Sequence, residues 1–226
     1  MTLTAMAPAV TAAVSAVTEV VLVAHGSPDP RHRRSVTTLA HRMSASTGLA
    51  VTTCYLEHDE PFATNWLLTG SDPSSRHRIV VPLLLTAGYH WRTDIPPIIG
   101  HNGHRATLLS PPQPAAFAAA VGELTQGASH VVLASAGSAR PEIVKRFADL
   151  ADVLAGEHEV TVALSPGDIT QHARRGSVVV PVLVADGIFA DRVRTAADAA
   201  GATTTAVLGD TPGFARTLVA EVTAAL

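Results

Sequence analysis

Two histidines and one glutamate stand where predicted buried strands end. His25 follows the apolar run "VVLVA", Glu57 closes "TTCYLE", and His90 comes just after "IVVPLLLTAG". Because the carboxyl ends of parallel strands share one edge of a sheet, we expect the three side chains to converge although they are far apart in the chain. Neutral imidazoles suit divalent ions such as Fe²⁺, Co²⁺, Ni²⁺ or Zn²⁺, and a carboxylate can bind metal or accept protons. The spacing therefore predicts a site for metal binding and proton transfer.

Each of these residues also has a structural interpretation. The two histidines can be unrelated, each satisfied by a neighbouring backbone group, and Glu57 can be a solvated loop acid. Cys54, the single cysteine, is typical of a small buried hydrophobe within a strand. A serine nucleophile in "AHGS" is disfavoured because the G-x-S-x-G elbow is absent.

Groups that could hold an anion lie beside the same predicted edge. Gly26-Ser27 separates a strand from a helix, and backbone N–H groups at such a turn can bind an anion. The alternative is a tight turn with a serine cap. Arg31 and Arg92 lie nearby and could form forked hydrogen bonds with ligand carboxylates. We therefore expect Ser27, Arg31 and Arg92 to contact the ligand.

Alternating strands and helices must position these residues. Eight apolar, β-branched runs predict strands at about 19–24, 50–56, 78–85, 105–109, 130–135, 159–164, 177–184 and 204–208. Helical patterns lie between and after them, at about 31–47, 61–69, 94–101, 114–125, 141–155, 167–174, 188–200 and 212–225. Near-continuous hydrophobic strands alternating with helices predict an α/β fold with parallel sheets covered on both faces.

An internal repeat predicts two similar lobes. "VVLVAHGSPDP" matches "VVLASAGSARP" at six positions, and "IVVPLLLTAGY" matches "VVVPVLVADGI" at five. We therefore expect a lobe of four strands at 19–126, a second at 127–226, and a ligand cleft between them. His25 aligns with Ala136 and His90 with Phe189, so the chemistry is expected in the first lobe.

Composition excludes several classes of protein. The 226 residues are 47% hydrophobic and 15% charged, which is typical of a compact protein rather than a disordered chain. The net charge of −3 gives no electrostatic footprint for nucleic acid. A single cysteine allows no intrachain disulfide framework and is compatible with a reducing compartment.

Residues 1–18 are apolar and uncharged, and we interpret them as a poorly ordered extension or a short docking helix. They lack the positive region of a secretory signal, and threonine, serine and proline dilute them too much for a membrane span. We expect a cytoplasmic protein, a monomer or homodimer, with neither nucleic acid nor membrane as a partner.

Three motifs resemble the sirohydrochlorin chelatases, the class II chelatases that include cobalt-inserting enzymes. They are "VAHGSPDPR", "YLEHDEP" and "VVPLLLTAGYHWRTDIP", and they span the predicted first lobe. The two-lobed length resembles the long bacterial form of the family. The resemblance implies insertion of a divalent metal into a tetrapyrrole, with no organic cofactor and the metal ion as a substrate.

The resemblance also implies roles for individual residues. His25 and His90 match the metal-binding and proton-accepting histidines of the family, and Glu57 matches its active-site acid. The substrate would be a tetrapyrrole with many carboxylates, held by arginines and backbone N–H groups around a cleft. Tyr89 and Phe189 are expected among the apolar residues that line the macrocycle, together with Leu84, Leu85, Trp91 and Ile188. The alternative for this apolar set is ordinary core or lid packing.

Three hypotheses follow. The leading one is insertion of Fe²⁺ into sirohydrochlorin toward siroheme, and its variant is insertion of Co²⁺ or Ni²⁺ into the same or a related macrocycle, as in a cobalamin-type pathway. The second is a metal or tetrapyrrole carrier without catalysis. The third is a two-lobed small-molecule binding protein whose Gly-Ser loops hold an anion.

Overall fold

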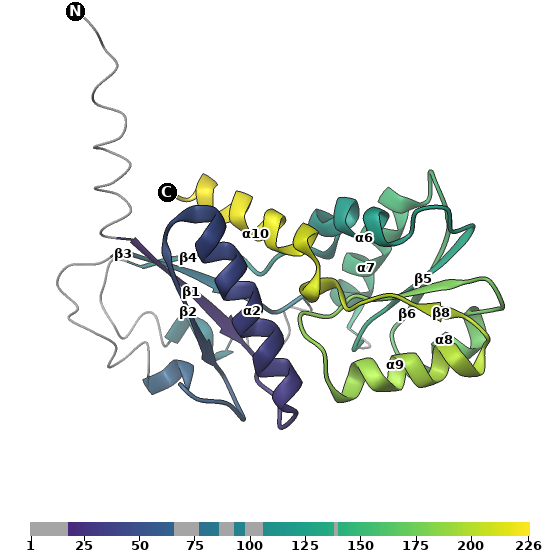
Figure 1. The fold of residues 1–226 in the computed structure, drawn as a ribbon, viewed down its shortest axis with the longest axis horizontal. Coiled ribbons are helices and arrows are strands. Elements are labelled where there is room, and N and C mark those ends of the chain that lie inside the picture. The colour runs from purple at the N-terminus through teal and green to yellow at the C-terminus, as the bar shows by residue number, and fades with distance from the viewer. Residues whose placement is uncertain (1–17, 66–76, 86–92, 98–105, 138–139) are drawn as a thin grey trace, which may run out of the picture.

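A computed structural model of the chain describes residues 18–65, 77–85, 93–97, 106–137 and 140–226. Within them, two parallel four-stranded sheets lie side by side along the long axis of the molecule, each flanked by helices (Figure 1). This arrangement confirms the predicted fold class of two similar α/β lobes.

The two sheets have the same strand order. The first runs β2, β1, β3, β4, and the second runs β6, β5, β7, β8. The strands of the first are β1 (Thr18–Ala24), β2 (Ala50–Tyr55), β3 (His77–Pro82) and β4 (Ala106–Leu108). Those of the second are β5 (His130–Ala134), β6 (Glu159–Ala163), β7 (Val178–Pro181) and β8 (Thr203–Thr204). All residues of β1 and β5 are buried, as expected for central strands covered on both faces.

Helices connect the strands and follow the last strand of each lobe. They are α2 (Pro30–Thr47), η1 (Pro114–Phe117), α6 (Ala118–Leu124), α7 (Pro141–Leu154), α8 (Pro166–His172), α9 (Ile188–Ala199), η2 (Leu208–Asp210) and α10 (Pro212–Ala224). Local sequence fixes the ends of α2: the Asp29 side chain accepts a hydrogen bond from the Arg31 N–H, Pro30 opens the helix, and Gly48 ends it with a φ of 70°.

Strand register supports the sequence repeat. Val23 lies opposite Cys54 on β2 and Pro82 on β3. Its counterpart Ala134 lies opposite Ala163 on β6 and Pro181 on β7. Because the repeat pairs Pro82 with Pro181, sequence and register give the same equivalence for these strands. The register alone also makes Cys54 equivalent to Ala163.

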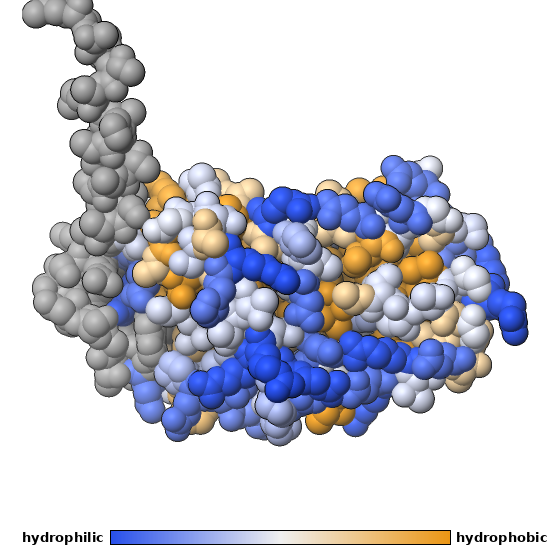
Figure 2. Space-filling view, viewed as in Figure 1, coloured by the Kyte–Doolittle hydropathy of each residue, from blue (hydrophilic) through white to orange (hydrophobic). Residues whose placement is uncertain are grey.

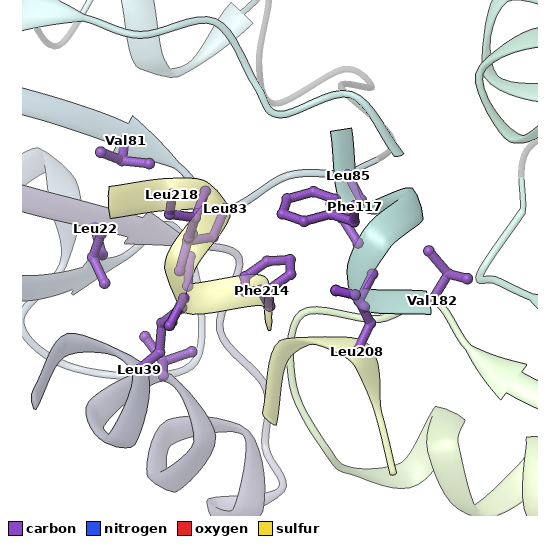
Figure 3. Packing of buried hydrophobic residues seen from close by; sticks show 14 of the residues in the cluster. Leu22, Leu39, Val81, Leu83, Leu85, Phe117, Val182, Leu208, Phe214 and Leu218 are labelled. Carbon is purple, nitrogen blue, oxygen red and sulfur yellow. The ribbon is translucent and has the colours of Figure 1, made fainter. Parts of the chain in front are cut away.

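The two lobes share one hydrophobic core. The last helix α10 packs against α2 of the first lobe, while η1 packs against α7 of the second. Phe117 and Phe214 stack between the lobes with ring centroids 4.4 Å apart, among buried leucines and valines of both sheets (Figure 3). The helices that end each half of the chain thus cross between the lobes, and the proposed domain boundary near residue 126 stays a prediction.

Several strands are shorter than predicted. The apolar run at 78–85 is a strand only as far as Pro82, and the run at 177–184 only as far as Pro181. Proline lacks the N–H that would extend the ladder, so the chain leaves the sheet there. The run at 204–208 gives only the two-residue strand β8, because the chain turns into the 3₁₀ helix η2.

Parts of the expected helices at 61–69 and 94–101, and residues 1–17 of the expected N-terminal extension, lie outside the described residues. Among the helices that are described, none combines the length and apolar character that a membrane crossing requires.

Candidate functional site

The carboxyl end of β1 places His25 directly beside Glu57. Beyond the last paired residues of the two strands, the Leu56 N–H donates to the Ala24 carbonyl at 3.0 Å and the Glu57 N–H donates to the His25 carbonyl at 2.8 Å. The ladder between β1 and β2 therefore continues for one more step on each strand. This continuation brings two of the three predicted site residues to one edge of the sheet.

The turn after His25 requires glycine. Gly26 has a φ of 92°, in the left-handed region that favours glycine. A Cβ atom on Gly26 would lie 1.7 Å from the Glu57 carbonyl oxygen, so no side chain fits without moving the backbone of Glu57. Gly26 thus holds the two strand ends together at the site.

The side chains at this edge form a small cluster of imidazole and carboxyl groups. His25 Nδ1 lies 3.1 Å from the Gly26 carbonyl oxygen, which favours the tautomer with its proton on Nδ1 and the lone pair on Nε2. The ring of His58 lies 6.4 Å from that of His25, and its Nε2 is 3.6 Å from a carboxylate oxygen of Glu57. Glu57 and His58 are each nearly half exposed, so protons can pass from them to solvent.

The third predicted ligand cannot be placed. His90 lies outside the described residues, as do Tyr89 and Arg92. Within the part of the chain that the structure describes, no group of three or more His, Cys, Asp or Glu side chains is arranged to hold a metal ion. The metal-binding roles of His25, Glu57 and His90 therefore stay predictions.

Ser27 lies at the site, but its backbone N–H is hydrogen-bonded to a carboxylate of the protein itself. Its N–H donates to the Asp59 carboxylate at 3.3 Å, and its hydroxyl accepts a hydrogen bond from the Asp29 N–H at 3.1 Å. The serine thus supports the turn into α2, as the alternative interpretation expects. Its predicted contact with substrate is untested.

A cavity of about 430 Å³ opens between the two lobes at this edge. The first lobe contributes His25, Ser27 and His32, together with Leu83–Leu85 after β3. The second lobe contributes residues 182–190, which lead from β7 into α9 and include the predicted Phe189. The volume falls within the range of small-molecule sites, and the walls are mainly apolar with a few polar groups.

His32 is a cavity residue that we did not predict. It lies in the first turn of α2, with its ring 6.3 Å from that of Tyr55. Burial lowers the pKa of His32, because apolar surroundings disfavour the imidazolium form. Its Nδ1 and the Tyr55 hydroxyl are buried without a hydrogen-bond partner among the described residues. Besides His25, the cavity wall therefore carries an imidazole whose neutral form is favoured by burial.

Arg31 joins the two lobes. Its guanidinium donates to Asp29 of its own lobe at 2.6 Å and to Asp191 of α9 at 2.9 Å. The hydrogen bond from Arg31 lowers the pKa of Asp29 to about 2, and the same guanidinium lowers the pKa of Asp191. Figure 2 shows hydrophilic residues gathered where the amino ends of α2 and α9 meet. Arg31 thus links α2 to α9 by ion pairs, and its predicted role in binding substrate stays a prediction.

The sequence held weak signals for the residues that were missed. Asp191 and Arg194 are three apart on α9, a spacing that favours the ion pair found there at 2.8 Å. His32 follows Arg31 in the first turn of the helix that begins beside the carboxyl ends of β1 and β2. Its place in the cavity wall could therefore have been predicted from the sequence. Only the tertiary structure brings Arg192 and Asp186 to the same cavity.

Comparison with known proteins agrees with this architecture. Residues 19–123, which hold His25 and Glu57, match the family model of CbiX. A search of curated proteins found no match.

Solved structures share the two-lobed fold over most of the chain. The sirohydrochlorin chelatase SirB from Bacillus subtilis subspecies spizizenii, in complex with cobalt, is 20% identical with a TM-score of 0.74, covering 92% of this chain and 94% of that one. SirB from Bacillus subtilis with Fe³⁺ is 19% identical with a TM-score of 0.73 over the same shares of the chains. DR2241 from Deinococcus radiodurans, a multi-domain protein, is 20% identical with a TM-score of 0.69, covering 91% of this chain and 54% of that one. The first lobe is therefore similar to the CbiX family, and the described chain as a whole has the two-lobed fold of these solved structures.

Proposed function

We propose that the chain inserts a divalent metal ion into a tetrapyrrole, with sirohydrochlorin as the macrocycle and Fe²⁺ as the ion. The observation that carries this proposal is that His25 lines a largely apolar cavity and that Glu57, on the neighbouring strand end, is hydrogen-bonded to the His25 backbone, both within the residues that match the CbiX family. The relation to the two SirB structures supports the choice of macrocycle.

The chemistry of insertion matches what these residues can do. A free-base tetrapyrrole must lose two pyrrole N–H protons as the dication enters, and the ion must shed bound water. His25 Nε2 can accept a proton or bind the ion, since Nδ1 faces the Gly26 carbonyl. Glu57, nearly half exposed and close to His58, can pass protons to solvent. In the proposal His90 supplies a further ligand for the ion.

The choice of metal rests on the ligand types alone. Imidazole and carboxylate donors accept Fe²⁺, Co²⁺ and Ni²⁺, and metal availability decides between such ions more than raw affinity does. The similar SirB structures contain cobalt in one case and iron in the other. We propose Fe²⁺, and Co²⁺ and Ni²⁺ are the variants that the experiment compares.

The test is anaerobic incubation of sirohydrochlorin with each ion, with and without the protein, following the absorbance change of the macrocycle. The proposal expects faster insertion with protein, fastest with Fe²⁺. Faster insertion with Co²⁺ or Ni²⁺ would revise the metal, and no acceleration with any ion would overturn the enzymatic function.

Replacing Glu57 separates an enzyme from a carrier. We expect Glu57→Gln to lower turnover by about 100-fold while tetrapyrrole binding is largely kept, because general acid–base groups contribute about that much. Glu60→Gln is the matched control, since Glu60 is an exposed acid three residues further along the same loop. Tetrapyrrole binding by the wild type without any turnover would favour the carrier.

A further inference from the structure

Three arginines lie where the second lobe meets the cleft, and they differ in their partners. Arg31 is held by Asp29 and Asp191, as described above. Arg194 is held by Asp191 at 2.8 Å and by Asp186 at 2.9 Å. Arg192 is exposed, and no described residue accepts a hydrogen bond from it or pairs with it. Two of the three guanidinium groups are thus occupied by carboxylates of the chain itself.

Arg192 is also the arginine, among the described residues, that lines the cavity between the lobes. It stands on the second lobe, whereas His25 lines the cavity from the first. A ligand that fills the cavity would therefore meet an imidazole from one lobe and a guanidinium from the other.

The position of Arg192 is set by its neighbours on α9. Val193 is fully buried in the core of the second lobe. Asp191 is bound by Arg31 of the first lobe, which holds the amino end of α9 against α2. Because Asp191 is paired with Arg31 and Val193 is buried in the core, the backbone of Arg192 between them is held in a fixed position relative to His25.

Asp186, the acidic residue among the described residues that line the cavity, is not a partner of Arg192. Asp186 lines the same cavity, but its carboxylate accepts hydrogen bonds from the Gly187 N–H at 2.8 Å and pairs with Arg194 at 2.9 Å. An arginine without such a partner, facing a ligand space, is suited to a carboxylate of the ligand in a forked, charge-assisted pair.

We infer that Arg192 binds a peripheral carboxylate of the tetrapyrrole from the second lobe and so orients the macrocycle over His25. This inference rests on the proposed function and adds to it a substrate-positioning residue outside the segment that matches the CbiX family. The second lobe then does more than close the cavity, because it supplies the charge that recognises an acidic substrate.

The test compares Arg192→Ala, Arg192→Lys and Arg192→Glu with Arg175→Ala. Arg175 is an exposed arginine of the same lobe, in the loop before β7 and so at the opposite edge of the sheet. Binding of metal-free sirohydrochlorin is measured by fluorescence titration, and KM and kcat are measured for Co²⁺ insertion. We expect Arg192→Ala to raise Kd and KM by about 10- to 100-fold, the usual worth of a hydrogen bond to a charged group, with kcat changed less than about twofold.

The other variants test the charge. Arg192→Lys keeps the charge without the fork and is expected to fall between wild type and Arg192→Ala, and Arg192→Glu is expected to bind most weakly. The loss in Arg192→Ala should shrink as salt is raised, because screening weakens the pair in the wild type. Thermal unfolding curves that match the wild type show that each variant is folded.

Two outcomes separate this inference from the proposed function. Wild type that binds and metallates sirohydrochlorin, with Arg192→Ala indistinguishable from Arg175→Ala, would overturn the role of Arg192 alone. A fall in kcat with unchanged KM and Kd would do the same. Wild type that neither binds nor metallates the macrocycle with any ion would overturn the proposed function, and the inference with it.

Discussion

The two lobes share a strand order and a register, yet they differ at the carboxyl edges of their sheets. His25 of the first lobe corresponds to Ala136 in the sequence repeat, and extending the strand register beyond its last pairs places Pro166 at the position of Glu57. His90 aligns in sequence with Phe189 of the cavity wall. Each polar group proposed for the chemistry is thus an alanine, a proline or a phenylalanine in the second lobe.

The opposite edges of the two sheets retain their polar character. In the first lobe buried Glu19 accepts hydrogen bonds from Arg78 at 3.3 Å and from Thr52 at 3.3 Å. In the second lobe the equivalent three positions are His130, Ser177 and Thr161, and both ring nitrogens of His130 are bonded, at 2.7 and 3.2 Å.

The physical difference between the two edges is burial. A buried polar group needs partners, so the residues of a buried network at one edge depend on one another. At the other edge His25 and Ala136 line the cavity and Glu57 is exposed, so an apolar residue in their place leaves no buried polar partner without a hydrogen bond. Polar residues at the carboxyl edge are therefore not required for folding. Their presence there in the first lobe indicates a role in the proposed reaction.

The largest expected effect on metal insertion comes from removing the imidazole of His25, and placing an imidazole at the equivalent position of the second lobe tests whether that lobe can replace it. We expect His25→Ala to reduce metal insertion by about 10²–10⁴-fold, because it removes the proposed proton acceptor and metal ligand. Adding Ala136→His to that variant is expected to restore nothing, because Pro166 stands at the position of Glu57 and the nearby Asp168 carboxylate already accepts a hydrogen bond from the Leu164 N–H at 3.1 Å. Insertion rates of the single and double variants check this, and recovery in the double variant would show that either lobe can carry the reaction.

The two equivalent glycines should separate stability from activity. A Cβ on Gly26 would lie 1.7 Å from the Glu57 carbonyl oxygen, and one on Gly137 would lie 2.2 Å from the Leu164 Cβ. We expect either glycine-to-alanine change to lower the free energy of unfolding by about 1–3 kcal/mol, the usual cost of overpacking.

Only Gly26→Ala is expected to reduce the activity of the protein that remains folded, because the atom it displaces belongs to Glu57. Urea unfolding measures the loss of stability, and insertion rates normalised to the folded fraction measure activity. Equal losses of normalised activity in the two variants would contradict the placement of the chemistry in the first lobe.

The smallest expected effect is on the pH dependence of stability. Burial lowers the pKa of His130 below its ordinary value of 6.5, and the nearby charge of Arg174 lowers it further. The folded state therefore keeps His130 neutral while the unfolded chain takes up a proton as the pH falls through 6.5. Stability attributable to His130 is present above that pH and is lost as the pH falls below it.

His130→Gln is expected to make this loss of stability shallower, because the amide can bond Ser177 and Thr161 but does not titrate. Part of the slope should remain, since burial also lowers the pKa of His32. Exposed His41→Gln of the first lobe is the control, and urea unfolding between pH 5 and 7 is the measurement. An unchanged slope in His130→Gln would show that the buried network is not what titrates.

The sequence by itself determined the strands, their order of appearance, the repeat and the edge at which His25 and Glu57 meet. Each of these follows from a local pattern: apolar runs for central strands, Asp29 and Pro30 for the start of a helix, and Gly26 for a turn that no other residue fits. Parallel pairing then leaves one edge where successive strands end, so residues distant in the chain could be predicted to converge.

Only the tertiary structure decided how the lobes face one another and which groups share the cavity. Arg31, Arg192 and Arg194 look alike in the sequence, yet two are neutralised by aspartates and one faces the ligand space. The crossing of α10 onto α2 and the neutral ring of His32 were likewise beyond prediction. Pairing and burial depend on contacts between segments that local patterns do not encode, because a charged side chain takes its role from what lies opposite it.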